Sequence, residues 1–223
     1  KDRVVMASGP EKSGVVMPSE ASLRAVFDRV NAKTLTAYAD SVSDKPLVPS
    51  IPKPGRVTTA KTIPEIGVTE WVLSNGIRVI LKPTDLKNDE VQFAAWSPGG
   101  SSLAPDSLVV AAETAVTVVS ESGFGAFGKV ELEKKLAGKV VSVSPWIDDL
   151  REGLSGGASP RDIDTMFHLI RLAFTAPRAD GSAFLSVVER MKGAVENRAA
   201  RPETAFGDTL STTLAGYSQR MRP

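Results

Sequence analysis

The feature that most constrains this fold is a pair of apolar runs that meet at Asn75-Gly76. Trp71–Leu73 comes before the dipeptide and Ile77–Leu81 follows it. Asn-Gly between apolar runs is the strongest short-range signal of a β-hairpin, because both central residues of a type I′ turn need a positive φ. The sequence therefore predicts two antiparallel strands here, joined by a type I′ turn.

Three more strands and six helices are predicted around this hairpin. Val91–Ala95 alternates like a strand and ends at Pro98-Gly99-Gly100, and two further strands are expected at 141–143 and 150–154. Asp106 is the expected cap of a helix that Gly123 stops. Helical spacing with start and stop residues predicts helices over 19–38, 106–122, 129–137, 159–174, 180–198 and 202–214. Because hairpins dominate and no βαβ rhythm is present, the expected class is α+β, an antiparallel sheet with helices packed on it.

A proline-rich stretch divides the chain. Five prolines lie between Lys45 and Pro64, and proline both fixes φ and removes a backbone donor. We expect an extended connector there. The short apolar run at residues 4–8 predicts a strand, and the chain starts without Met or a signal-peptide layout, so we expect a fragment. The predicted organisation is the C-terminal end of a preceding domain at 1–45, a Pro-rich linker at 46–68 and a second domain at 69–223.

Composition excludes several kinds of site. The chain has no Cys and one His, so it offers no disulfide, no thiolate nucleophile and no site that needs two imidazoles. A net charge of +1 provides no electrostatic footprint for nucleic acid, whose binding needs clustered Lys and Arg. No apolar run approaches the ~20 residues that span a bilayer.

Several blocks of this sequence resemble, in order, a domain of the insulinase/pitrilysin family of zinc peptidases. The hairpin at 71–82 is followed by Lys82-Pro-Thr84, Asn88-Asp89-Glu90 and Ser97-Pro-Gly99-Gly100-Ser101. The later landmarks are Leu136-Ala-Gly138-Lys139, Gly156-Gly-Ala-Ser159-Pro160-Arg-Asp162 and Phe174-Thr175-Ala-Pro177-Arg178-Ala-Asp180. The run from Val4 to Lys12 looks like the last strand of a preceding domain. Agreement of several blocks is far more specific than any single motif.

The resemblance implies repeated α+β domains, paired into two halves that close around a peptide. The catalytic half of such peptidases carries His-x-x-Glu-His on the first long helix after the hairpin, where two imidazoles and a distal Glu hold zinc. Aligned on Glu113, the two His positions fall on Val110 and Thr114, and Glu196 falls near the distal ligand. Val and Thr cannot replace the imidazoles, so we expect no catalytic and no metal-binding residue in this chain.

A role follows from the resemblance. It implies a non-catalytic domain of an insulinase-like zinc metalloendopeptidase, which closes the chamber and helps to hold the peptide substrate. Zinc is then expected in the catalytic half of the parent protein, and the partner is that half or a separate catalytic subunit. The alternative is an inactive assembly or partner subunit of the same fold, with no peptidase activity in the full chain. The resemblance alone suggests a bacterial periplasm or envelope.

Other candidate residues have simpler interpretations. Glu113 is expected on a solvated helix face. His168 lies beside the apolar stripe predicted for its helix and is expected to pair with Asp164 on the surface rather than to act as a general base. That stripe comprises Ile163, Phe167, Ile170 and Phe174.

The glycine-rich run at 153–157 lacks the lysine of a P-loop and is expected to be a turn. The mixed charges between Glu131 and Lys139 predict an exposed helix face. Tyr217 and Arg220 invite comparison with substrate-binding side chains of active relatives, but the local pattern does not carry that role over, and no substrate-binding residue is assigned. We expect instead that an exposed strand edge pairs with extended peptide by β-augmentation.

Overall fold

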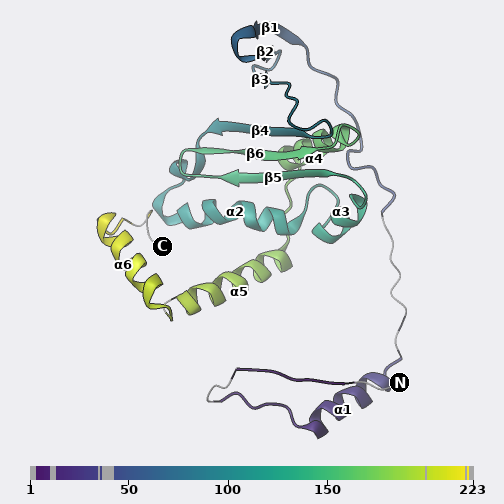
Figure 1. Ribbon diagram of the computed structural model, residues 1–223, viewed down its shortest axis with the longest axis vertical. Coiled ribbons are helices and arrows are strands. Elements are labelled where there is room, and N and C mark those ends of the chain that lie inside the picture. Colours follow the sequence, from purple (N-terminus) through teal and green to yellow (C-terminus); the bar gives the residue numbers. More distant parts are fainter. Residues whose placement is uncertain are drawn as a thin grey trace. The chain divides into compact units, whose positions relative to one another are not determined.

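The computed structural model describes residues 4–10, 14–34, 36, 43–198, 200–218 and 220 of the 223. The chain divides into two compact units, residues 1–41 and 42–223 (Figure 1). None of the described helices is long and apolar enough to cross a membrane. Each unit is described by itself below.

The first unit contains one helix, α1 (Glu20–Asn31). Ser19 caps it as expected for this residue type, with its side-chain oxygen accepting a hydrogen bond from the backbone N–H of Ser22 at 3.2 Å. The helix ends earlier than predicted, and Tyr38, its predicted end, lies outside the described residues. The strand predicted at 4–8 is wrong for the described part of the chain, because residues 4–10 are exposed and pair with no strand.

The second unit begins with a three-stranded antiparallel sheet of order β1-β2-β3. Its strands are β1 (Val57–Ile63), β2 (Val68–Leu73) and β3 (Arg78–Leu81), with the short 3-10 turn η1 (Pro64–Ile66) after β1. The predicted connector was therefore partly wrong: it contains β1, which pairs along its length with β2. The five prolines lie outside the seven residues of β1, so every residue of that strand retains its backbone donor.

The hairpin is where the sequence predicted it, but its turn differs. Gly76 has φ 85°, whereas Asn75 does not have a positive φ, since Tyr217 is the only described non-glycine residue that does. The N–H of Gly76 donates to the carbonyl of Leu73, and the N–H of Leu73 donates to that of Ile77. This is a three-residue loop with a left-handed glycine rather than a type I′ turn.

A second antiparallel sheet has the order β4-β6-β5. Its strands are β4 (Val91–Pro98), β5 (Val141–Ile147) and β6 (Arg151–Ala158), close to the predicted positions. β5 is longer than predicted and contains Pro145, which an edge strand tolerates because its outer side needs no donor. The glycine-rich run is part of the central strand β6 rather than the predicted turn, and Gly153 pairs with both Trp96 and Trp146.

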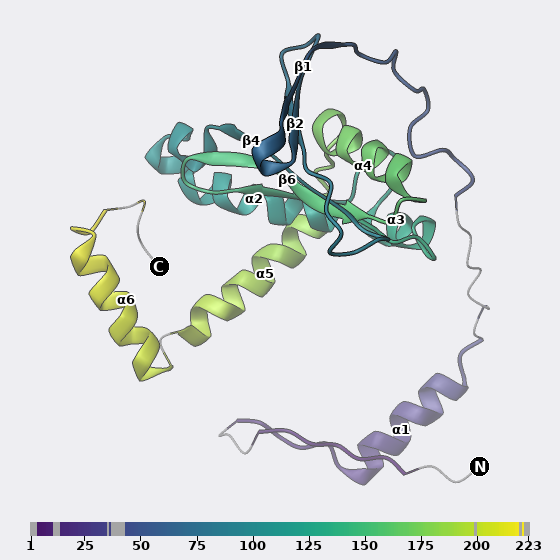
Figure 2. The same cartoon turned by 45° about the horizontal axis from the view of Figure 1, so that its top comes forward.

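Helices cover one face of this sheet (Figure 2). α2 and α4 pack against β5, and α4 also packs against β6. The main core lies between them and contains Val48, Phe124, Phe127, Leu132, Leu169 and Leu172. The helices of this unit are α2 (Val109–Ser122), α3 (Lys129–Lys135), α4 (Ile163–Thr175), α5 (Gly181–Arg198) and α6 (Pro202–Leu214), with short 3-10 turns η2 (Gly100–Leu103) and η3 (Asp106–Leu108) before α2. The α+β class with antiparallel sheets is confirmed.

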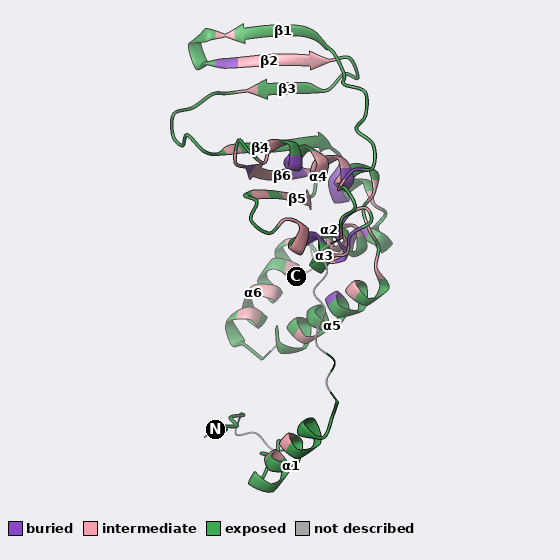
Figure 3. Cartoon of the chain, turned by 90° about the vertical axis from the view of Figure 1, so that its right-hand side faces the viewer, coloured by how far each residue is buried: buried purple, intermediate pink, exposed green. Residues whose placement is uncertain are grey.

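Two details of the helices differ from the prediction. Asp106 lies in η3 and does not cap α2, which starts at Val109 without a side-chain cap. In α4, Met166, Leu169 and Leu172 are buried, while Phe167 and Phe174 of the predicted stripe are 59% and 67% exposed. Figure 3 shows buried residues of this unit where its helices meet the sheet. Both faces of α4 are apolar, so spacing within the helix could not show which face packs.

Candidate functional site

The helix that would carry a zinc motif does not fit zinc. On α2, Val110 is exposed and has no donor atom, and the hydroxyl of Thr114 donates to the carbonyl of Val110 at 2.7 Å. Glu113 and Glu196 are both exposed, on α2 and α5 respectively. Among the residues that the structure describes, no group of three or more His, Cys, Asp or Glu side chains could hold a metal.

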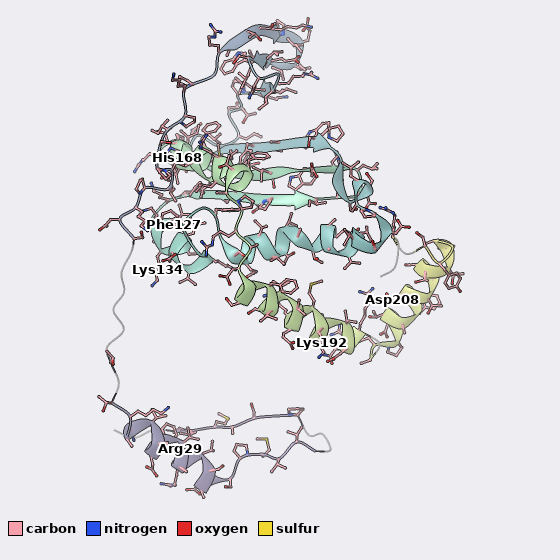
Figure 4. All side chains as sticks on the ribbon, turned by 180° about the vertical axis from the view of Figure 1, so that it is seen from behind. Arg29, Phe127, Lys134, His168, Lys192 and Asp208 are labelled. Carbon is pink, nitrogen blue, oxygen red and sulfur yellow. The ribbon has the colours of Figure 1, made fainter. Side chains whose placement is uncertain are left out.

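His168 lies half-buried on α4 (Figure 4). Within the described residues, no ion pair joins it to the exposed carboxylate of Asp164. As the chain's single His it has no second imidazole to work with. Along the helix it lies between the exposed Phe167 and the buried Leu169, at the border between the exposed and the buried face of α4.

The mixed charges of α3 hold local structure together. The carboxylate of Glu131 accepts a hydrogen bond from the N–H of Gly128, at the start of the helix. Lys135 donates to the carbonyl of Ser43 at 2.9 Å and lies 5.3 Å from the ring centre of Phe127. The predicted exposed face is thus correct for Glu131 and Glu133, whereas Lys135 is half-buried.

The two C-terminal candidates lie apart from any site. The side chain of Arg220 is hydrogen-bonded to the η2–η3 segment. Its Nε donates to Oδ1 of Asp106 at 2.6 Å, and its other two nitrogens donate to the backbone carbonyls of Ser101 and Ala104. Tyr217 follows α6 with φ 61° and is exposed. The residues Met221 and Arg222 lie outside the described part.

An open strand edge is the most distinctive feature of the second sheet. In the described chain, β4 is paired along one side only, to β6, over all of its eight residues. Five consecutive residues, Ala94–Pro98, are exposed. An unpaired row of N–H and C=O groups of this length is a template for another extended chain.

The other edge strands are less suited to pairing. β5 carries Pro145, which lacks a donor, and β3 has only four residues. β1 has an irregular register between Val57 and Thr59 and an exposed Lys61 in its middle, and both features discourage pairing at an edge. β4 also contains a proline, Pro98, but at its end, so the seven residues before it combine length with a regular register.

A depression of about 400 Å³ adjoins the start of β4. Its wall is charged on one side, where Lys87 and Glu90 form an ion pair of 3.2 Å. Hydrogen bonds from Lys87 and then from Gln92 lower the pKa of Glu90. The remaining wall comes from the start of β5 and the end of β6, where Gly156 and Gly157 contribute no side chain.

The face of the sheet away from the helices is lined by small and polar residues. Along β6, Leu154 and Ala158 are buried, whereas Gly153, Ser155 and Gly157 on the opposite face are half-buried. Their neighbours on β4 are Gln92, Ala94 and Trp96, all exposed. Trp96 is 61% exposed, and the guanidinium carbon of Arg151 lies 5.8 Å from its ring centre.

Sequence reasoning did not single out Trp96 or the edge of β4. A usable signal was present: Gln92, Ala94 and Trp96 alternate with Val91 and Phe93, which places a large aromatic residue on the polar face of a strand. Whether β4 lies at an edge depends on strand order, which no local pattern contains.

The chain is similar in sequence to proteins that are described as zinc proteases. No family model matches the chain. It is 27% identical over 206 residues to an Arabidopsis thaliana protein described as zinc protease PQQL-like, covering 90% of this chain and 19% of that protein. It is also 29% identical over 105 residues to a probable zinc protease PqqL of Haemophilus influenzae, covering 47% of this chain and 11% of that protein.

Two solved structures have the same fold. The periplasmic protease PqqL from Escherichia coli matches with a TM-score of 0.68 and 24% identity, over 88% of this chain and 22% of that one. A mutant of the ferredoxin protease FusC, in complex with Arabidopsis ferredoxin, matches with a TM-score of 0.67 and 21% identity, over 90% and 22%. The chain thus spans about a fifth of the length of the first relatives it matches. The resemblance seen in the sequence is confirmed over this stretch.

Proposed function

The chain belongs to the insulinase/pitrilysin family of zinc peptidases, and we propose that it is a non-catalytic segment whose open β4 edge holds extended peptide for a catalytic half elsewhere in the parent protein. The observation that carries this proposal is the combination of an α2 helix without zinc ligands and a regular, unpaired, eight-residue edge. The segment contributes binding, and the chemistry lies in another part of the protein.

Peptide binding at β4 would proceed by strand addition. The backbone N–H and C=O groups of β4 that point away from β6 would pair with those of the peptide, each hydrogen bond contributing roughly 1 kcal/mol net. Main-chain pairing reads little of the peptide's sequence, which suits a protease that accepts extended segments. The parent's zinc would activate the water that attacks the amide, and Val110 and Thr114 leave no place for it here.

Partners and compartment follow from the same relationship. The partner is the catalytic half of the same protein or a separate catalytic subunit. The solved relative from Escherichia coli is described as a periplasmic protease, and we extend that location, periplasm or envelope, to the parent of this chain.

N-methylated peptides test strand addition. Alternate amides of an extended peptide point toward β4 or away from it, so a labelled nine-residue peptide is made in two forms, each N-methylated on one alternate set. Because pairing reads little of the peptide's sequence, either form can shift by one residue and turn its unmodified amides toward β4. Anisotropy titration of the 223-residue chain should therefore show that both forms bind, whereas a third form, N-methylated on every residue, does not. Binding of the fully N-methylated form, or no binding of the unmodified peptide, would contradict the proposal.

The parent protein distinguishes the alternative. If it carries zinc and cleaves peptides, and loses cleavage when the edge is blocked by a competing peptide, the binding role stands. A zinc-free, inactive parent whose β4 edge binds no peptide would instead be an assembly subunit of the same fold.

A further inference from the structure

Trp96 occupies an unusual position on the open edge. It is a large aromatic residue, 61% exposed, on the helix-free face of β4. Tryptophan exposed to this degree contributes little to the folded core, whereas its ring is a large apolar contact surface for another molecule. The strand that carries it is the one that offers its backbone to a peptide.

The position beside Trp96 on β6 has no room for a side chain. The partner of Trp96 on β6 is Gly153, and a side chain there is excluded: a Cβ atom would lie 2.0 Å from the carbonyl oxygen of Ala95 and 2.8 Å from Cζ2 of Trp146. The ring of Trp146, across the sheet on β5, therefore lies over Gly153. Gly153 thus separates the two tryptophans without a side chain between them.

Arg151, which is the diagonal neighbour of Trp96 on β6, places its charge against the ring of Trp96. The guanidinium of Arg151 lies over Trp96, and Asp148 holds it through an ion pair of 3.2 Å. The Asp148 carboxylate also accepts the N–H groups of Leu150 and Arg151, so it is held by the tight turn before β6. Trp96 thus has an ion-paired cation over its ring and still leaves 61% of its surface exposed.

We infer that Trp96 selects the bound peptide, favouring an aromatic or large apolar side chain at the one residue that pairs with it. This inference rests on the proposed function. Directly opposite residues on one face of a sheet have Cβ atoms about 4.5–5.5 Å apart, and aromatic pairs at that position are among the favourable ones. The neighbouring row on this face contains Ala94, Ser155 and Ser144 and offers no aromatic surface, so the preference is confined to one register position.

A positional scan tests the inference. A labelled nine-residue peptide of Thr and Val receives a single Tyr or Ala at each position in turn, and its affinity for the 223-residue chain is measured by anisotropy. Because this peptide can shift its register, Tyr should be favoured over Ala by about threefold to tenfold at the central positions, where a shift that places it beside Trp96 keeps most of the pairing. In Trp96→Ala this ratio should fall to about one while the affinity for the Ala peptide is unchanged. Trp96→Tyr should keep the ratio, which shows that the edge still folds.

A control and the contrary results complete the test. Phe167→Ala removes an equally exposed aromatic residue from α4 and should leave the Tyr/Ala ratio intact. Binding with no preference for Tyr over Ala at any position, or a preference that persists in Trp96→Ala, would overturn the inference while leaving strand addition in place. Absence of binding by every peptide would remove both proposals. Dimerisation of the chain that Trp96→Ala abolishes would overturn the inference, because the edge would then bind a second copy.

Discussion

The carboxylate of Asp162 accepts a hydrogen bond from the backbone N–H of Val140 at 2.9 Å, which ties the start of α4 to the segment leading into β5. The same carboxylate accepts the hydroxyl of Ser159 at 2.8 Å and lies 3.4 Å from Nζ of Lys139. In the sequence, Asp162 lies near the start of the helix predicted over 159–174. In the structure it joins two elements more than twenty residues apart.

Asp162 makes the stability of the chain depend on acid pH. Hydrogen bonds from Val140 and then from Ser159 lower the pKa of Asp162. Its contribution to stability is therefore complete above the unfolded-state value of about 4 and is lost as the pH falls through the lower folded-state pKa. Thermal unfolding followed between about pH 2 and pH 6 should show this loss, and Asp162→Asn should weaken it. Asp164→Asn, at an exposed carboxylate of α4, is the control. If the two variants lose the same amount of Tm on acidification, the pH dependence does not come from Asp162.

The packed face of α4 predicts opposite outcomes for two large apolar residues. Leu169 is 3% exposed in the main core, whereas Phe167 is 59% exposed. Leu169→Ala should lower the free energy of unfolding by about 2–5 kcal/mol, because it leaves a cavity. Phe167→Ala should change it by about 0.5 kcal/mol or less. Urea denaturation of both variants checks the assignment, and a larger loss at Phe167 would show that the originally predicted stripe packs.

Replacement by alanine should have opposite effects on stability at Gly153 and at Gly193. A Cβ at Gly153 would lie 2.0 Å from the carbonyl oxygen of Ala95, so Gly153→Ala must push β4 and β6 apart. We expect a loss of about 1–3 kcal/mol in the free energy of unfolding. Gly193 on α5 has open space around its Cβ position, so Gly193→Ala should stabilise the chain by about 0.5–1 kcal/mol. Equal effects at the two sites would mean that the strands are not in close contact at Gly153.

The limits of sequence reasoning can be seen at particular residues. The Asn75-Gly76 signal located a hairpin because turn chemistry is local, yet the turn type depends on the register of β2 and β3. The packing of α4 was misassigned because Met166 and Leu169 form one apolar face and Phe167 and Phe174 another. The prolines marked a connector, but β1 is a strand because β2 pairs with it. In each case the missing information was how one strand or helix pairs or packs with another.

The candidate site shows the same division. Residue types sufficed to predict that α2 holds no imidazole pair, because Val110 and Thr114 are visible in the sequence. The open edge of β4 was predictable only as a general possibility, since the order β4-β6-β5 places the last strand of the three in the centre. Trp96 acquires a role only once its strand is known to be an edge. The predicted domain bounds at 46–68 and the non-catalytic role remain proposals.

Zinc removal should have no effect on this chain. The side chain of Val110 has no atom that can bind zinc, and the hydroxyl of Thr114 is hydrogen-bonded to a helix carbonyl. We therefore expect elemental analysis to find no stoichiometric zinc in the purified 223-residue chain, and EDTA to leave its Tm unchanged. The double variant Val110→His with Thr114→His is the positive control. It places two imidazoles four residues apart on one helix face, beside Glu113, and should bind zinc and gain Tm that EDTA removes. Stoichiometric zinc in the unaltered chain would show that other residues form a metal site, and the non-catalytic assignment would then be wrong.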